Sequence, residues 1–547
     1  MKKPVFIRVC AILGIGAGVI FGSNQVRAEG TIVYVVPNGT GDGSSWENAT
    51  SFEGAVNKGY AATEDFEIWM KEGVHKGLSQ IGYSLNKNVV IRGGFAGTET
   101  RAEERLEGTY STVDGENGRI PMSLNVNKAT EIERVILTKS SKQGLYAKVA
   151  AGVSLVLRDC RFVCNGTNAN SQVDGRGVYI EGDKSSSEVR FEGCRFEGNV
   201  VRPNVSNYAD AGYGNGAYLL NLKKAVMVDT VFLTNGYLMA SERVAARYVG
   251  GAALYAESVC LAATNCSFIG NVGYSYSGSN SGALYSGGIV RMVGNCEGSV
   301  FDHCRWVGNR NVREYGYESD SSVNNAIDIG VLFVNNGDVS RTVTLESCTM
   351  AYNLCGSLKS AAGVNAKLAT VNIHNSIFYG NMIPAASEMD NDVASVDGQA
   401  KINISWTMMD HEPTGTGVSC ENLIVGTPQF VTGLEEFLGY VYTGEGSGIA
   451  YPKVDVDTFD MRFKTDAETI AKVLNMDVHV LSKAGYYKND GKMYRGAEVF
   501  SGAIDAGDPE SGYEKEGAPN GGRINLGAYG NTAQASLSCK GFCIRIR

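Results

Sequence analysis

Proline, histidine and long apolar runs are all scarce in this chain. Only 10 of the 547 residues are proline and only 5 are histidine. The histidines are scattered, without the spacing typical of a metal site, so we predict no metal ligands among them. After the first 28 residues, no segment approaches the roughly 18 consecutive apolar residues of a membrane-spanning helix, and none is predicted.

Basic residues are outnumbered by acidic ones. The chain has 49 Lys and Arg against 58 Asp and Glu, which gives a net charge of −9. This balance argues against nucleic acid or an anionic membrane as a partner. Glycine, by contrast, is abundant at 69 residues, as is typical of a turn-rich all-β protein.

The first 28 residues have the three parts of a secretory signal. Lys2, Lys3 and Arg8 form a basic start, residues 9–21 are apolar, and the chain then reaches Ala28 at a small-residue cleavage site. We predict cleavage after Ala28 and a secreted or cell-surface protein, with an uncleaved anchor as the alternative. Loss of the four basic residues of this segment takes the net charge from −9 to −13.

A repeat of the form apolar-x-apolar-x-x-small-x-aromatic-x-x-Asn dominates the middle of the chain. Its copies begin at Leu155, Val189, Ala225, Leu261, Ser299, Val343, Val371 and Ile402. Each half alternates with period two, which predicts strand, and the two residues before the small position break the alternation and predict a bend. A third strand, such as Val178-Tyr179, precedes each copy. Stacking of such coils into one continuous core predicts a parallel β-helix.

The repeat also predicts the environment of two residue types. The small position is filled by Cys160, Cys194, Cys266, Cys304 and Cys348. We expect these to be buried free thiols, with disulfides between coils as the alternative. Cys539 and Cys543 are better disulfide candidates because they are close in sequence.

The asparagine position is predicted to form an internal ladder through Asn199, Asn235, Asn271 and Asn309. Asparagine tolerates left-handed backbone, and its amide can bond the copies above and below. We therefore expect a structural role for this column.

Several segments carry a family resemblance. Residues 34–46 resemble the N-terminal cap of bacterial pectate-lyase-like proteins, residues 51–59 their short capping helix, and residues 89–95 their first coil. Residues 426–430 are similar to the strand that leaves the helix, and residues 501–509 and 519–532 resemble the choice-of-anchor Q region. The resemblance implies an all-β, right-handed, single-stranded parallel β-helix. It implies an N-terminal cap with first coils at 29–130, repeats at 131–415 and a C-terminal cap at 416–547.

Catalytic residues are not identifiable from the sequence. A lyase of this superfamily needs clustered carboxylates for calcium and a basic residue, and a hydrolase needs a carboxylate pair. Residues 406–411, from Trp406 to His411, resemble the lyase Trp-Ile-Asp-His run with two extra residues, and the repeat explains their register. Asp302-His303 is a candidate acid/base pair or a turn. Asp505 and Asp508 are turn residues or, alternatively, calcium ligands.

Long inserts follow the asparagine column, and stacking of the coils predicts that they form one edge. They are rich in tyrosine and arginine, which suit sugar rings and acidic groups. Our candidate ligand-binding residues are Tyr208, Tyr213, Tyr274, Tyr276, Arg313, Tyr315 and Tyr317. The alternative is that these rings pack the loops onto the barrel.

The sequence therefore predicts a monomer without a cofactor, unless calcium is one. It predicts binding to polysaccharide or a cell-surface glycan, or an adhesin-like role. The alternative is a polysaccharide lyase or glycoside hydrolase of the same superfamily.

Overall fold

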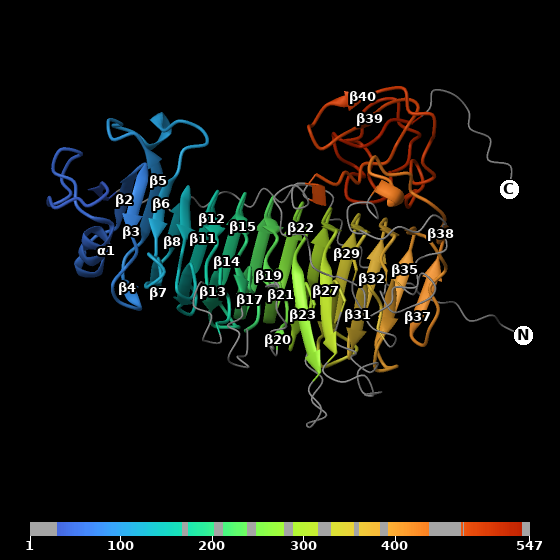
Figure 1. Ribbon diagram of the computed structural model, residues 1–547, viewed down its shortest axis with the longest axis horizontal. Coiled ribbons are helices and arrows are strands. Elements are labelled where there is room, and N and C mark those ends of the chain that lie inside the picture. Colours follow the sequence, from blue (N-terminus) through green and yellow to red (C-terminus); the bar gives the residue numbers. More distant parts are fainter. Residues whose placement is uncertain are drawn as a thin grey trace, which may run out of the picture.

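Three rows of parallel strands run along the molecule (Figure 1). The computed structural model describes residues 30–166, 173–201, 212–237, 248–277, 288–315, 330–354, 360–382, 392–436, 472–473 and 475–538. Each coil gives one strand to each row and then climbs to the next coil, so every neighbour in a row is parallel. The chain is a parallel β-helix, which confirms the fold class that the repeat predicts.

The rows form three faces. The first face contains β4 (Tyr83–Leu85), β7 (Met122–Val126), β10 (Leu145–Val149), β13 (Val178–Glu181), the start of β17 (Ala217–Val228), the start of β21 (Leu254–Thr264), β24 (Val290–Val293), β28 (Leu332–Asn335), β31 (Val364–Lys367) and β34 (Val393–Ser395). The second contains β1 (Thr31–Val35), β2 (Phe66–Lys71), β5 (Val89–Phe95), β8 (Thr130–Glu133), β11 (Ser154–Arg158), β14 (Glu188–Glu192), the ends of β17 and β21, β25 (Ser299–Asp302), β29 (Thr342–Glu346), β32 (Thr370–His374), β35 (Lys401–Ser405) and β37 (Val418–Glu421). The third contains β3 (Gly73–Lys76), β6 (Ser111–Asp114), β9 (Val135–Thr138), β12 (Arg161–Val163), β15 (Arg195–Glu197), β18 (Val231–Leu233), β22 (Ser267–Ile269), β26 (Arg305–Val307), β30 (Thr349–Ala351), β33 (Ile377–Tyr379), β36 (Met408–Met409) and β38 (Ile424–Val425).

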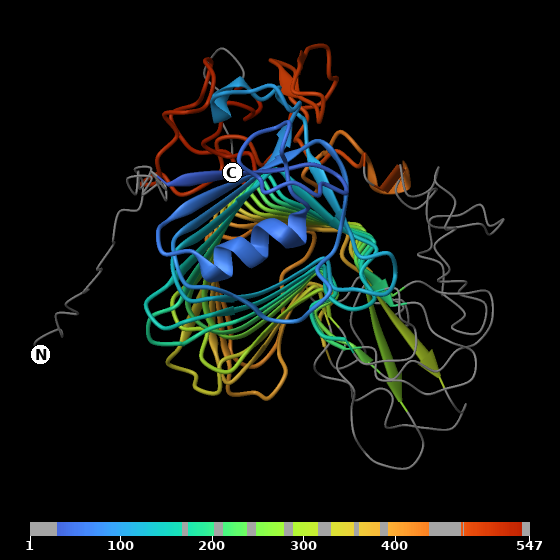
Figure 2. The ribbon, with the colours of Figure 1, turned by 90° about the vertical axis from the view of Figure 1, so that its left-hand side faces the viewer.

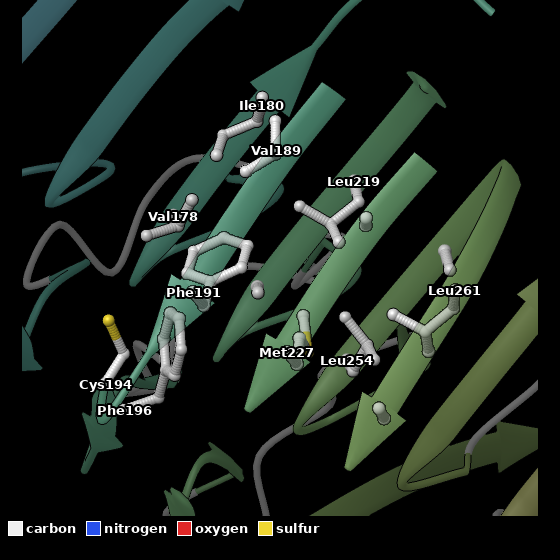
Figure 3. Close-up of a cluster of buried hydrophobic side chains, with 14 of the residues drawn as sticks. Val178, Ile180, Val189, Phe191, Cys194, Phe196, Leu219, Met227, Leu254 and Leu261 are labelled. Atoms are coloured by element: carbon white, nitrogen blue, oxygen red, sulfur yellow. The ribbon is translucent and has the colours of Figure 1, made fainter. Parts of the chain in front are cut away.

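Alternate side chains of each strand fill the core between the faces (Figure 3). In β14, Val189 and Phe191 are buried, whereas their neighbours are not. Along the third face the aromatic position of each repeat forms an internal stack, with centroids 4.5–5.3 Å apart. The members of this stack are Phe162, Phe196, Phe232, Phe268 and Trp306. Offset or parallel stacking of fully buried rings adds to the stabilisation that their burial already provides.

The cysteine column is buried and its thiols are free, as predicted. The five members, Cys160, Cys194, Cys266, Cys304 and Cys348, are each at most 1% exposed. Each thiol lies within hydrogen-bond distance of a carbonyl of the preceding coil, for example 3.5 Å from Cys266 Sγ to Met227 O. Burial raises the pKa of the Cys160, Cys266 and Cys304 thiols well above the usual value. A thiol in this position is inert and acts as a small apolar side chain.

The asparagine column forms the predicted ladder. The amide of Asn199 donates to Asn235 Oδ1 at 2.9 Å, that of Asn235 to Asn271 Oδ1 at 3.0 Å, and that of Asn271 to Asn309 Oδ1 at 3.0 Å. The prediction was wrong in one respect, because left-handed backbone does not fall on the ladder residue. It falls on the residue before it, such as Thr234 at φ 49°, which turns the chain so that the next amide points along the column.

Helix α1 (Phe52–Ala61) lies across the N-terminal end of the coils (Figure 2). Ser51 begins it, because the Ser51 hydroxyl accepts a hydrogen bond from the Gly54 amide at 3.1 Å. Phe52, Ala55 and Val56 then pack into the same core cluster as the coils. The capping helix expected at residues 51–59 is confirmed. A 3₁₀ turn, η1 (Ala102–Glu104), follows β5.

The C-terminal region lies against the outer side of the third face (Figure 1). Phe430, Val478 and Ile504 belong to one buried cluster with Ile269 and Val307 of the coils. The hairpin of β39 (Tyr486–Tyr487) and β40 (Met493–Tyr494) belongs to this region. Cys539 and Cys543 lie outside the described residues, so their pairing stays a prediction.

A smaller sheet begins directly after the asparagine column. It contains β16 (Val200–Val201), β19 (Gly236–Tyr237), β20 (Tyr248–Val249), β23 (Val272–Ser277) and β27 (Arg310–Tyr315). In Figure 2 the green and yellow-green strands of this sheet project away from the body of the β-helix. No helix in the described part of the chain is long and apolar enough to cross a bilayer.

Candidate functional site

Four tyrosines form a row on the outward side of the first face. Tyr146, Tyr179, Tyr218 and Tyr255 occupy the same register position on β10, β13, β17 and β21. Their ring centroids are 5.2, 5.2 and 4.8 Å apart, and the first pair is nearly parallel at 6°. The row continues in register into Arg291, whose guanidinium lies 4.6 Å from the centre of the Phe333 ring.

The alternation of each strand places these rings outside. In β13, Val178 and Ile180 are buried in the core, so Tyr179 between them stands on the opposite side of the sheet. The row differs along its length in exposure. Tyr146 and Tyr179 are partly exposed, whereas Tyr218 and Tyr255 are 8% and 9% exposed. The accessible part is therefore the end formed by Tyr146 and Tyr179, which we call the outer tyrosine pair.

Charged groups flank the row. Lys148 Nζ lies 3.6 Å from Glu181 Oε2, next to the outer tyrosine pair. Further along, the Tyr218 hydroxyl donates to Glu257 Oε2 at 2.7 Å. Burial and the Glu181 carboxylate raise the pKa of Tyr179 to about 12, so this phenol stays protonated and can donate. Carboxylates and phenols together offer both acceptors and donors for hydroxyl groups.

Four of the candidate residues from the sequence fall on the smaller sheet. Tyr208 and Tyr317 lie outside the described residues. Tyr274 and Tyr276 are in β23, and Arg313 and Tyr315 are in β27. The two strands pair in parallel, with Tyr276 opposite Glu314 and Tyr315 opposite Ser277. The backbone of these four residues is therefore brought together.

Tyr213 is the candidate that reaches the tyrosine row. Its ring centroid lies 5.0 Å from that of Tyr255, and its amide donates to Asp174 Oδ1 at 2.8 Å. This ring packs its loop onto the barrel, as the alternative interpretation expected. It also shows that the loops and the outward side of the first face adjoin.

Sequence reasoning missed the row itself. The repeat predicts the strands of Tyr179, Tyr218 and Tyr255 but not that of Tyr146, and it gives no role to their outward rings. The signal was available, because a ring between two core positions must face outward in every coil.

A second polar cluster lies where the C-terminal region meets the second face. Asp302, Glu346 and His374 are register neighbours on β25, β29 and β32. Adjacent strands put such side chains about 5 Å apart. His374 Nε2 is 3.3 Å from Asp508 Oδ2, and the Glu346 carboxylate accepts from Asn375 Nδ2 at 3.0 Å. We call these residues the junction cluster.

Electrostatics within the junction cluster raise the pKa of Glu346 above its usual value. Burial raises its pKa and the Asp302 carboxylate adds to the shift, against the opposing effects of His374 and Asn375. Burial alone would lower the pKa of His303, but its 2.6 Å contact with Asp302 outweighs burial and the net shift is upward. His303 has φ 53°, so it occupies the left-handed turn position, and its Nε2 contacts Gly530 O at 2.8 Å. The turn interpretation of Asp302-His303 is therefore confirmed, and the acid/base interpretation stays a prediction.

The remaining candidates have structural partners. Thr407 and Met409 are buried core positions, as the repeat predicts, and the Arg523 guanidinium lies 5.0 Å from the Trp406 ring. Asp505 Oδ1 accepts from the Gly521 amide at 2.9 Å and from Ser538 Oγ at 2.8 Å. Both partners are distant in sequence, so these bonds hold segments of the C-terminal region together, whereas φ 53° places Asp505 itself in a left-handed turn position.

Comparison with known proteins adds little beyond the fold. No protein-family model matches the sequence, and no curated protein matches it. Among solved structures, the crystal structure of pectate lyase Pel9A is similar, with 13% identity, coverage of 91% of this chain and 95% of that chain, and a TM-score of 0.38. A similarity this low carries no argument about activity, and the β-helix is established by the strand pairing itself. The choice-of-anchor Q resemblance stays a prediction.

Proposed function

We propose that this protein is exported and binds polysaccharide along the outward side of its first face. The observation that carries the proposal is the row of stacked tyrosines, with its accessible outer tyrosine pair. Successive rings are separated by about the length of one sugar residue in an extended chain, so two consecutive residues of a polysaccharide parallel to the long axis can each meet one ring of the outer tyrosine pair.

Hydrogen bonding dominates this recognition. Tyr146 and Tyr179 stack on each other, so their ring faces are used within the row. Side chains on a sheet stand roughly perpendicular to it, which puts the hydroxyl ends farthest from the core. Sugar hydroxyls can donate to Glu181 and accept from the Tyr179 phenol and Lys148. Their apolar C–H groups contact the ring edges.

The flanking charges favour a neutral polysaccharide. Asp174, Glu181 and Glu257 lie close enough to the row to affect the pKa of its phenols, and Lys148 is the basic group paired with Glu181. Carboxylates would repel a polyuronate. Tyr274, Tyr276, Arg313 and Tyr315, in β23 and β27, stay candidate ligand-binding residues within the same proposal.

The experiment replaces the two outer hydroxyls without disturbing the stack. A Tyr146→Phe/Tyr179→Phe variant keeps both rings, so its melting temperature should match that of the wild type. Affinity for the polysaccharide that binds wild type best, in a panel of neutral and uronate chains, should fall about tenfold, because each lost hydrogen bond contributes about 0.5–1.5 kcal/mol.

Tyr60→Phe is the matched control. Tyr60 is 60% exposed and lies on α1, which precedes the coils that carry the tyrosine row. It should bind as wild type does. Unchanged affinity in the double variant, or a panel in which no polysaccharide binds, would refute the proposal.

Hydrolysis at the junction cluster is a second candidate. The raised pKa of Glu346, with the Asp302 carboxylate beside it, is the pattern of a general acid next to a second carboxylate. Register neighbours start from strands about 5 Å apart, which allows the two carboxyl groups to reach the spacing found in retaining glycosidases. Glu346 would protonate the leaving oxygen, and Asp302 would attack or stabilise the sugar carbon.

Glu346→Gln tests this second candidate. Any glycosidase activity found with the same panel should fall roughly 10²–10⁴-fold, because general acid catalysis contributes that much. Glu421→Gln is the control. Glu421 lies in the same register column as Glu346 and His374, two strands beyond His374, but its side chain is exposed. Equal activity in both variants would exclude the junction cluster as the catalytic site. The two candidates lie on different faces and can be tested separately.

A further inference from the structure

The asparagine ladder ends on a carboxylate. Asn353 donates to Asn381 Oδ1 at 2.8 Å, and Asn381 in turn donates to Asp392 Oδ1 at 2.8 Å. The next repeat has Glu412 where an asparagine is expected. Asp392, directly before β34, thus takes the place of the missing rung.

Two further side chains meet Asp392 at this corner. Asp410 and His411 follow β36, and one ligand-type atom from each of the three residues lies within 4.8 Å of the others. Asp410 Oδ2 also accepts from the Gly380 amide at 3.0 Å, and Asp410 Oδ1 lies 2.5 Å from His411 Nδ1. Among the described residues, this is the group of His, Cys, Asp and Glu compact enough to hold one ion.

One oxygen of Asp392 makes no hydrogen bond. The residue is fully buried, and Oδ2 has no hydrogen-bond partner among the residues that the structure describes. An unsatisfied buried carboxylate oxygen costs more than a neutral polar atom would. A second carboxylate, Asp410, lies in the same cluster, and two negative charges this close are unfavourable without a cation between them.

We propose that Asp392, Asp410 and His411 bind one divalent transition-metal ion, of the Zn²⁺ or Mn²⁺ type. Two carboxylates with one imidazole form a mixed oxygen and nitrogen set, whereas Ca²⁺ takes oxygen ligands alone. Three protein ligands leave room for water, which can enter past His411, whose side chain is 27% exposed.

The ion would act as the terminal rung of the ladder. It would tie the start of β34 on the first face to the end of β36 on the third face, at the corner where the asparagine repeat stops. The site is separate from the tyrosine row and from the junction cluster, and the inference does not depend on either.

Metal binding to the full-length exported protein tests the proposal. Protein treated with a chelator and dialysed should bind Zn²⁺ or Mn²⁺ stoichiometrically in calorimetry, and its melting temperature should rise on addition of the ion. Asp392→Asn keeps the acceptor for Asn381 but loses the charge. Since even the neighbours of metal ligands are worth about 10- to 100-fold in affinity, loss of a ligand should weaken binding by about 100-fold or more.

Two variants complete the design. His411→Gln removes the more exposed ligand and should show the same loss, which keeps the test open if Asp392→Asn fails to fold. Asp397→Asn is the control, because Asp397 caps a nearby turn through the Gln399 and Ala400 amides and lies outside the cluster. No ion binding by wild type, equal binding by all variants, or binding of Ca²⁺ alone would each overturn the assignment.

Discussion

Replacing Asn271 with leucine would break the ladder at its centre while keeping the side chain's size. The Asn271 amide donates to Phe232 O and to Asn309 Oδ1, both at 3.0 Å. Its oxygen accepts from the backbone amide and the side-chain amide of Asn235, again both at 3.0 Å. Leucine makes none of these four contacts.

The expected loss follows from the groups left behind. The Asn235 backbone N–H and the Phe232 carbonyl lose the partner that Asn271 supplies, in a column that is fully buried. Each buried polar group without a partner costs about 1–3 kcal/mol, so the free energy of unfolding should fall by about 2–6 kcal/mol. The side-chain amides of Asn235 and Asn309 still donate to the backbone carbonyls of Phe196 and Phe268, so the loss of hydrogen bonds is limited to one rung.

Urea unfolding and amide hydrogen exchange together measure this change. Because a solenoid can lose cooperativity between coils, faster exchange at Asn235 provides a local readout beside the midpoint. Asn403→Leu is the control, since the amide of Asn403 donates to Asn372 Oδ1 in a matching stack on the exposed surface. That change should stay within about 0.5 kcal/mol. An equally small effect for Asn271→Leu would refute the structural role of the ladder.

Three further predictions concern thiols, pH and processing. The buried column thiols, such as Cys266, should resist a thiol reagent in native protein and react fully in denaturant without reductant; thiols that stay silent there would be paired. Burial raises the pKa of Glu516 to about 7 from 4.5, so between these values the unfolded chain releases a proton that the folded chain keeps. The free energy of unfolding should therefore fall as pH rises through this window, by up to about 3 kcal/mol, and Glu516→Gln should flatten that part of the curve in denaturation at several pH values. Intact-mass analysis of exported protein should give a chain that starts at Glu29, and a mature chain that retains Met1 would contradict cleavage after Ala28.

The coils could be predicted because the same physical constraint recurs in each of them. A corner that admits only a small side chain selects Cys160, and a ladder that needs one amide per rung selects Asn199. Each repetition adds an independent observation of the same pattern. One detail of the repeat was predicted wrongly, namely which residue has left-handed backbone. The sequence pattern marks the ladder residue, such as Asn235, whereas the turn is made by the residue before it, Thr234.

Contacts across long sequence separations could not be predicted in this way. His303 meets Gly530 across a sequence separation of 227, and no periodicity connects a coil to the C-terminal region. The role of Asp392 could not be predicted because this residue belongs to no copy of the repeat. The tyrosine row was visible in the sequence, but outward rings satisfy no core constraint, so nothing in the pattern required them.

The ladder also allows the number of coils, and so the length of the molecule, to change during evolution. Every rung donates to the following coil and accepts from the preceding one, so no rung is specific to its position. A coil gained or lost by duplication or deletion of its DNA would leave the remaining rungs with the same partners. The fixed parts are α1, which covers the N-terminal end of the coils, and Asp392, on which the ladder ends. Relatives of this protein can therefore differ in reach by whole coils while keeping the same ends.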